Sequence, residues 1–176
     1  MRVPMLRLLG CTLLAGITVA CAAGLPSIPP VAHVELPRYM GRWYVIAAIP
    51  THFERNAWNA VETYTLRMDG NVDTTFHFND GSEDGPYKHI QSVGYVHSGS
   101  GNAVWGVQVF WPFKAQYVVA YLKPDYSEVI VARDARDYAW VMARTPEVSA
   151  ADWETLTSRL RSLGYDMSKL RRVPQS

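Results

Sequence analysis

Eight short runs of β-branched and aromatic residues, each ended by a turn sequence, occupy the chain from residue 43 to residue 143. Met68-Asp69-Gly70-Asn71 separates two of them as a hairpin turn would. Short runs broken in this way indicate consecutive antiparallel strands, and eight strands can close into a barrel that has no exposed edge. The sequence therefore predicts an all-β fold, an eight-stranded antiparallel up-and-down β-barrel. Its strands are expected over residues 43–49, 60–67, 72–78, 88–97, 103–110, 117–122, 128–132 and 138–143.

One α-helix is predicted after the last strand. Ser149 suits the N-cap, and Asp152 follows three residues later, as in a capping box. Gly164 stands where a C-cap glycine belongs. The apolar residues between them share one face of the helix: Trp153, Leu156, Leu160 and Leu163. We expect this C-terminal helix to pack that face against the outside of the barrel.

The first twenty residues have the pattern of a signal peptide. Arg2 and Arg7 give the chain a basic start. An apolar run follows over residues 8–20 and is too short to span a bilayer comfortably. Small residues then precede Cys21, a pattern that resembles a bacterial lipobox, whose cysteine is acylated and becomes the new N-terminus. We expect a lipoprotein signal peptide over 1–20, lipidated Cys21 with a Pro-rich tether over 21–34, and the barrel domain over 35–176. An ordinary secretory signal cleaved nearby is the alternative.

The residue after Cys21 bears on location. Lipoproteins that stay at the inner membrane typically carry Asp there, whereas this chain has Ala22. We therefore expect an outer-membrane protein, held by its N-terminal acyl chains and facing the periplasm. Two or three such chains anchor a protein stably.

Composition and motifs exclude several classes of function. The 17 Lys and Arg residues nearly balance the 16 Asp and Glu residues, so the basic surface needed for nucleic acid is not expected. Cys11 and Cys21 both lie in the N-terminal segment, which leaves the mature domain no thiol for catalysis or zinc. G-x-S-x-G and H-E-x-x-H are absent. His77 and His89 fall on neighbouring predicted strands, but a metal would need a third ligand that the sequence does not indicate. Neither enzyme activity nor a cofactor is predicted.

Alternation along the predicted strands gives the side chains that face inward, because successive residues point to opposite faces. This interior could be filled solid or could enclose a pocket. The loop over 50–58 adds two apolar side chains, either as a satellite core or as a lip over the entrance. The predicted ligand-binding residues of cavity and mouth are Phe53, Trp58, Phe76, Phe78, Trp105, Val107, Val109, Tyr117, Tyr121, Tyr138, Trp140 and Met142.

Three segments, in order, carry a family resemblance. Gly41-Arg42-Trp43-Tyr44 resembles the G-x-W motif of lipocalins, the segment 117–126 stands where their second motif stands, and the segment 140–146, with Arg144-Thr145, resembles the third. The second match is loose, because Lys123-Pro124 replaces a more typical turn. Together with the lipobox, these segments resemble the bacterial outer-membrane lipoprotein lipocalins over residues 34–173.

The resemblance implies both structural roles and a function. Trp43 would plug the closed end of the barrel, Arg144 would stack on its ring, and Gly41 would permit their close approach. The ligand would be a fatty acid or a lysophospholipid, bound for storage or transport. The alternatives are a non-catalytic protein-interaction or membrane-stress module, or a binder of haem or another pigment. A homodimer that extends the cavity mouth is also compatible with the sequence.

Overall fold

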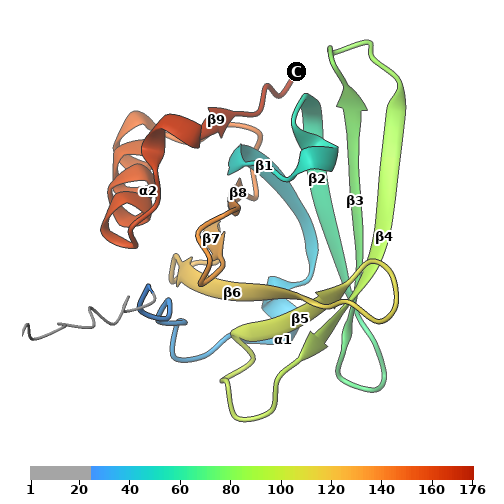
Figure 1. Ribbon diagram of the computed structural model, residues 1–176, viewed down its shortest axis with the longest axis vertical. Coiled ribbons are helices and arrows are strands. Elements are labelled where there is room, and N and C mark those ends of the chain that lie inside the picture. Colours follow the sequence, from blue (N-terminus) through green and yellow to red (C-terminus); the bar gives the residue numbers. More distant parts are fainter. Residues whose placement is uncertain (1–24) are drawn as a thin grey trace, which may run out of the picture.

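The computed structural model describes residues 25–176, except the side chain of Phe53. The predicted signal peptide and Cys21 lie outside the described residues. Eight strands wrap around a common interior, and helix α2 (Ala150–Ser162) lies outside them (Figure 1). The strands are β1 (Gly41–Ile49), β2 (Ala57–Leu66), β3 (Val72–Asp80), β4 (Tyr87–Val96), β5 (Val104–Gln108), β6 (Ala115–Leu122), β7 (Glu128–Ala132) and β8 (Ala139–Ala143).

The strands form one closed antiparallel ladder. Each strand pairs with the next in the sequence, and β1 pairs with both β2 and β8, which completes the ring. A two-residue strand, β9 (Arg171–Arg172), pairs with Ala47 and Ala48 of β1. The predicted eight-stranded barrel with one external C-terminal helix is confirmed.

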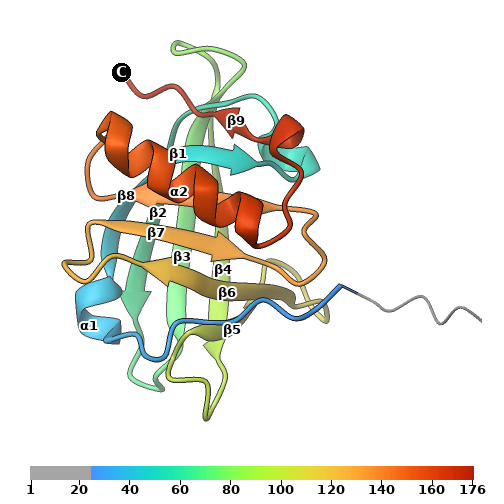
Figure 2. The same ribbon diagram turned by 90° about the vertical axis from the view of Figure 1, so that its left-hand side faces the viewer.

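Antiparallel order places successive connections at opposite ends of the barrel. The connections β1–β2, β3–β4, β5–β6 and β7–β8 surround one end, which we call the open end. The other connections lie at the closed end together with the short helix α1 (Leu36–Tyr39) (Figure 2). Helix α1 is not among the predicted elements. Pro37 in its first turn is compatible with a helix start, because proline lacks only an N–H that would have no partner there.

Residues 25–34, which we call the N-terminal strap, run along the outside of the barrel from the open end to the closed end (Figure 2). Backbone N–H groups fasten it: Ile28 donates to Asp134 Oδ1 over 2.7 Å, and Val31 donates to the Val119 carbonyl over 2.8 Å. Near the closed end the Val34 N–H donates to the Gly101 carbonyl over 2.8 Å. The predicted tether is therefore partly docked on the barrel.

Two hydrophobic cores stabilise the fold. The inner core lies inside the barrel and includes Trp43 and Trp105. The outer core joins α2 to the sheet, where Leu156 and Leu160 pack among outward residues of β7 and β8 such as Val141. None of the described helices is long and apolar enough to cross a membrane.

The ends of α2 follow the sequence signals. Ser149 is the N-cap, and its hydroxyl oxygen accepts a hydrogen bond from the Asp152 N–H over 3.0 Å. Gly164 has φ +86°, a conformation that favours glycine, and allows the Tyr165 N–H to reach the Leu160 carbonyl. The helix is thus stopped where it was predicted to stop.

Candidate functional site: the barrel cavity

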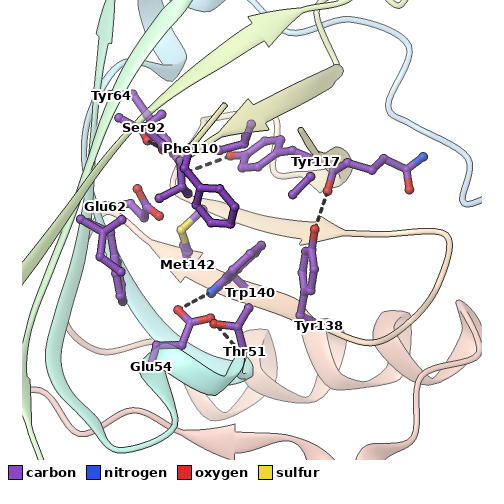
Figure 3. Close-up of a pocket in the computed structure, with 17 residues that line it drawn as sticks. Thr51, Glu54, Glu62, Tyr64, Ser92, Phe110, Tyr117, Tyr138, Trp140 and Met142 are labelled. Atoms are coloured by element: carbon purple, nitrogen blue, oxygen red, sulfur yellow. Dashed lines mark hydrogen bonds between the residues drawn. The ribbon is translucent and has the colours of Figure 1, made fainter. Parts of the chain in front are cut away.

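The open half of the barrel encloses a cavity of about 540 Å³. Apolar side chains from several strands form most of its wall, among them Phe76 and Ile90. Met142 is another, and Figure 3 shows it inside the barrel. Val109 and Phe110, from the loop after β5, stand at the rim. The interior is therefore not filled solid, and its unoccupied part communicates with the open end.

Tyrosines make the floor of the cavity. The Tyr117 hydroxyl lies between two others, 2.9 Å from the Tyr64 hydroxyl and 2.7 Å from that of Tyr39 in α1. Trp105 stacks on Tyr117 with 4.6 Å between ring centroids. Burial raises the pKa of both Tyr64 and Tyr117 well above the usual value, so their hydroxyls stay protonated. These hydroxyls already bond to one another, so they are poorly placed to form hydrogen bonds with a ligand.

Below this floor, Trp43 and Arg144 close the barrel. The guanidinium carbon of Arg144 lies 3.8 Å from the centroid of the Trp43 ring, within the range of a cation–π contact. The same guanidinium donates to the carbonyls of Arg42 over 2.7 Å and of Arg38 over 2.8 Å. The Trp43 indole N–H donates to the Tyr39 carbonyl over 2.8 Å. Backbone carbonyls of α1 and of the start of β1 thereby have side-chain donors.

Gly41 lies beside this pair at the start of β1. Its φ is +87°, where a side chain would be strained, and a Cβ there would stand 3.6 Å from Arg144 Nη1. The predicted arrangement of Gly41, Trp43 and Arg144 matches this geometry. Their contribution to stability remains a prediction.

Two glutamates face the cavity, and their surroundings differ. Glu54, in the 3₁₀ turn η1 (His52–Glu54), accepts hydrogen bonds from the Thr51 N–H over 2.9 Å and from the Trp140 indole over 3.1 Å. Glu62, from the middle of β2, points into the cavity (Figure 3), and its Oε2 is buried with no hydrogen-bond partner. Burial, and then the Glu54 charge, raise the pKa of Glu62 to about 8. Among the described residues that line the cavity, none is basic.

The structure brings many of the predicted ligand-binding residues together. The cavity wall contains Phe76, Val107, Val109, Tyr117, Tyr138, Trp140 and Met142. They come from β3, from β5 and the loop after it, from β6, and from β8 and the turn before it, so one cavity unites segments far apart in the sequence. Ligand contact by each of them remains a prediction.

The other predicted residues lie elsewhere. Phe78 is packed in the inner core against Phe76, and Trp105 lies behind Tyr117 rather than in the wall. Trp58 borders a separate hollow, together with Arg55 of the β1–β2 loop and Arg171 and Arg172 of β9. The side chain of Phe53 is not described, so its place as a lip residue is untested.

Tyr121 requires a correction. Strict alternation predicted that it faces inward with Tyr117, but the register of β6 against β7 shifts between Val119 and Tyr121. Such an irregularity adds a residue and turns the following side chains to the opposite face. Tyr121 consequently packs in the outer core, with the Arg159 guanidinium 4.1 Å from its ring centroid.

Several cavity residues were missed from the sequence. Glu62 and Tyr64 share the inward face of β2, a strand whose alternation was not used to choose wall residues. The pattern itself could have supplied them, although an acidic residue in a strand suggests an outward position. The remaining missed residues come from loops or from strand positions that were not chosen as wall residues: Thr51, Glu54, Thr74, Ile90, Ser92, Phe110, Ala115 and Gln116.

The histidine pair considered for a metal is adjacent in space. His77 of β3 and His89 of β4 are direct partners in the antiparallel ladder. Burial, followed by the nearby Arg42 charge, lowers the pKa of His77. No group of three or more His, Cys, Asp or Glu residues in the described part of the chain is arranged to hold a metal ion.

Comparison with known proteins supplies the context for this cavity. A family described as a lipocalin-like domain matches residues 34–175. Temperature-induced lipocalin-1 of Arabidopsis thaliana is 31% identical over 81% of this chain and 80% of its own length. Outer membrane lipoprotein Blc of Escherichia coli K12 is 30% identical over 97% of both chains. Among solved structures, insecticyanin of the tobacco hornworm Manduca sexta superposes with a TM-score of 0.64 at 14% identity, covering 86% of each chain, and so supports the fold alone.

Proposed function

Because this chain belongs to the lipocalin-like family, we propose that its barrel reversibly binds an apolar small molecule and catalyses no reaction. The observation that carries this proposal is the cavity of about 540 Å³ with its largely apolar wall. Pockets for small molecules commonly have volumes of about 300–1,000 Å³ and a few polar groups among apolar ones. The dimensions and the chemistry of this cavity both fit that description.

Burial of methylene groups supplies the affinity in this mechanism. Each buried methylene contributes about 0.8 kcal/mol, and ten would contribute roughly 8 kcal/mol before the entropic cost of association is subtracted. A single acyl chain therefore binds usefully with few polar contacts. We propose a fatty acid or a lysophospholipid as the ligand, taken up for storage or transport.

The proposed location is the outer membrane, with the barrel held by acyl chains on Cys21 and facing the periplasm. Relatives named outer membrane lipoprotein Blc, which align over nearly the whole chain, support this location. The lipobox-like residues before Cys21 support it independently. Mass spectrometry of the N-terminal peptide from the native host would reveal acylation directly.

Ligand binding can be tested with the soluble domain. Every strand and both hydrophobic cores lie within residues 25–176, so protein that begins at residue 22 retains the whole fold. A neutral fluorescent probe, N-phenyl-1-naphthylamine, should bind and be displaced by acyl lipids at micromolar concentrations. If neither the probe nor any lipid binds, the proposal is wrong. Mass spectrometry of lipids that copurify with this domain would then identify the ligand.

A further inference from the structure

Glu62 is a carboxyl group placed where an apolar cavity gives it no partner. Its Oε2 has no hydrogen bond and no exposure to solvent, although the side chain projects into the cavity (Figure 3). A buried polar atom without a partner is costly and rare in native proteins. Two donors of the wall are engaged elsewhere, since the Trp140 indole bonds to Glu54 and the Tyr64 hydroxyl to that of Tyr117. A donor on a molecule bound in the cavity would supply the partner that this oxygen lacks.

We propose that Glu62 is the polar contact for the enclosed ligand, and that this ligand presents a hydrogen-bond donor, a hydroxyl or an amine, instead of a carboxylate. Above about pH 8, where Glu62 is ionised, a carboxylate placed here would meet its charge, and the described wall offers it no basic side chain. Like charges in a poorly solvated site repel strongly. A fatty acid would consequently have to keep its carboxylate outside, at the open end.

A matched series of ligands tests this selectivity, which rests on the proposed binding function. Dodecanol, dodecylamine and dodecanoate share one chain length and differ only at the polar end. Each would be titrated at pH 9, where Glu62 is ionised, against protein of residues 22–176 loaded with N-phenyl-1-naphthylamine. We expect the alcohol and the amine to displace the probe at least tenfold more effectively than dodecanoate.

Two variants assign that selectivity to Glu62. In Glu62→Ala the preference should shrink to threefold or less, whereas Glu147→Ala, an exposed acidic residue after β8, should leave it unchanged. Equal or tighter binding of dodecanoate to the wild type, or the same preference in Glu62→Ala, overturns the assignment. Failure of the wild type and of Glu62→Ala to bind the probe or any of the three ligands would instead contradict the proposed function. Thermal unfolding of each variant verifies that it is folded.

A second, independent feature is an apolar loop at the open end. Residues 109–114, which we call the mouth loop, connect β5 to β6. Trp111 is 85% exposed, Phe113 68% and Phe110 62%. Soluble proteins rarely expose large apolar side chains side by side without a binding role. The loop also ends in Lys114, whose ammonium lies over the Tyr95 ring.

The course of the strap indicates what covers this loop. The strap reaches the open end where Ile28 is bonded to Asp134 of the β7–β8 connection. Leu25 is the first described residue, and Cys21 stands four residues before it. Four extended residues span at most about 14 Å. An anchor on Cys21 therefore starts from the same end of the barrel as the mouth loop.

The geometry points to a lipid bilayer as the partner of the mouth loop, with the open end facing the membrane. Aromatic side chains favour the interfacial region of a bilayer. A ligand could then pass between bilayer and cavity without crossing much water. This proposal depends on the proposed membrane location and not on the identity of the ligand.

Cosedimentation tests the docking. Protein of residues 22–176, without an anchor, would be mixed with vesicles of phosphatidylethanolamine and phosphatidylglycerol. Trp111→Ser combined with Phe113→Ser should reduce the bound fraction at least fivefold. Met68→Ser, which alters a fully exposed apolar residue at the closed end, should not reduce it.

Three outcomes would overturn the docking. These are no binding of the wild type to vesicles, equal binding by the double variant, or an equal loss in Met68→Ser. The double substitution could instead change the sedimentation coefficient of the free protein and leave vesicle binding unchanged. That result would identify a second copy of this chain as the partner of the mouth loop. Probe binding by the cavity provides the control for folding.

Discussion

Arg144 covers the Trp43 indole with its guanidinium carbon 3.8 Å from the ring centroid, while its nitrogens bond to backbone carbonyls of the chain just before and within β1. One side chain from the segment after β8 therefore joins the closed end of the barrel to the start of its first strand. The contact combines cation–π attraction with hydrogen bonds from a charged donor, both of which are stronger in a partly desolvated place.

Arg144→Ala should lower the free energy of unfolding by about 2–4 kcal/mol, because several carbonyls lose a charged donor and a ring loses its cover. Arg144→Lys should recover only part of this loss, since an ammonium lacks the planar array of donors. Urea unfolding measures the change, with Arg161→Ala on the exposed face of α2 as the control. Unfolding midpoints that match the wild type would contradict the role.

Trp43→Ala should also destabilise the barrel, by roughly 3–5 kcal/mol, as expected when a large buried ring is removed. Trp43→Phe keeps a ring under Arg144 but loses the hydrogen bond to the Tyr39 carbonyl. It should therefore be intermediate. An unchanged melting temperature for Trp43→Ala would be incompatible with a structural plug.

Glu62 should make stability depend on pH. Its pKa is about 8 in the folded protein and near its ordinary value of 4.5 when unfolded, so the folded state holds the proton more tightly. Stability should be highest below about pH 4.5 as far as this group is concerned, and should fall as pH rises toward 8. Above that, the contribution of this group is constant.

Glu62→Gln removes that titration. The difference in unfolding free energy between Glu62→Gln and wild type should grow between pH 5 and pH 8, to a few kcal/mol. Glu83→Gln, in the exposed β3–β4 loop, is the matched control. Parallel pH profiles for wild type and Glu62→Gln would show that Glu62 is ionised freely in the folded protein.

Gly101→Ala should release the strap. Gly101 has φ +61°, and a Cβ there would overlap the carbonyl oxygen of Ala32. Gly99→Ala is the control, because Gly99 also has positive φ, +76°, but has open space beside it. Hydrogen exchange at the amides of Val31 and Val34 should accelerate in Gly101→Ala more than in Gly99→Ala. Equal rates would mean that the strap tolerates the added methyl group.

Ala115→Trp should block the cavity, because Ala115 lies in its wall near the open end. Displacement titrations with an acyl lipid should show at least a tenfold weaker affinity, while the far-UV circular dichroism stays that of the wild type. Ala135→Trp, in the exposed β7–β8 connection, should bind as the wild type does. Full affinity in Ala115→Trp would place the ligand outside this cavity.

The order of strands and the external helix were predictable because periodicity, turns and caps are local signals. Ser149 and Gly164 marked the ends of α2 almost to the residue. α1 was missed since four residues leave no periodic pattern. The docking of the strap was missed because it depends on contacts with segments about 65 to 105 residues away.

The cavity wall was only partly predictable. Strict alternation works where a strand is regular, as for Phe76 and Val107, and fails at a register shift, as for Tyr121. Nothing local reveals such a shift. Glu62 shows a second limit of prediction from sequence. An acidic residue in a strand usually points to solvent, but the Glu62 side chain faces the cavity, where its Oε2 is buried. The volume of the cavity depends on how aromatic side chains from different strands pack across the barrel. The sequence of a single strand does not determine that packing.

The strap also decides how the barrel would respond to mechanical tension from its N-terminal side. The hydrogen bonds of Ile28, Val31 and Val34 are spread along the length of the barrel wall. A pull at residue 25 would meet them one after another, beginning with Ile28, before any tension reached β1. The strap could thus peel away and take up an outward displacement while the barrel ring stays closed.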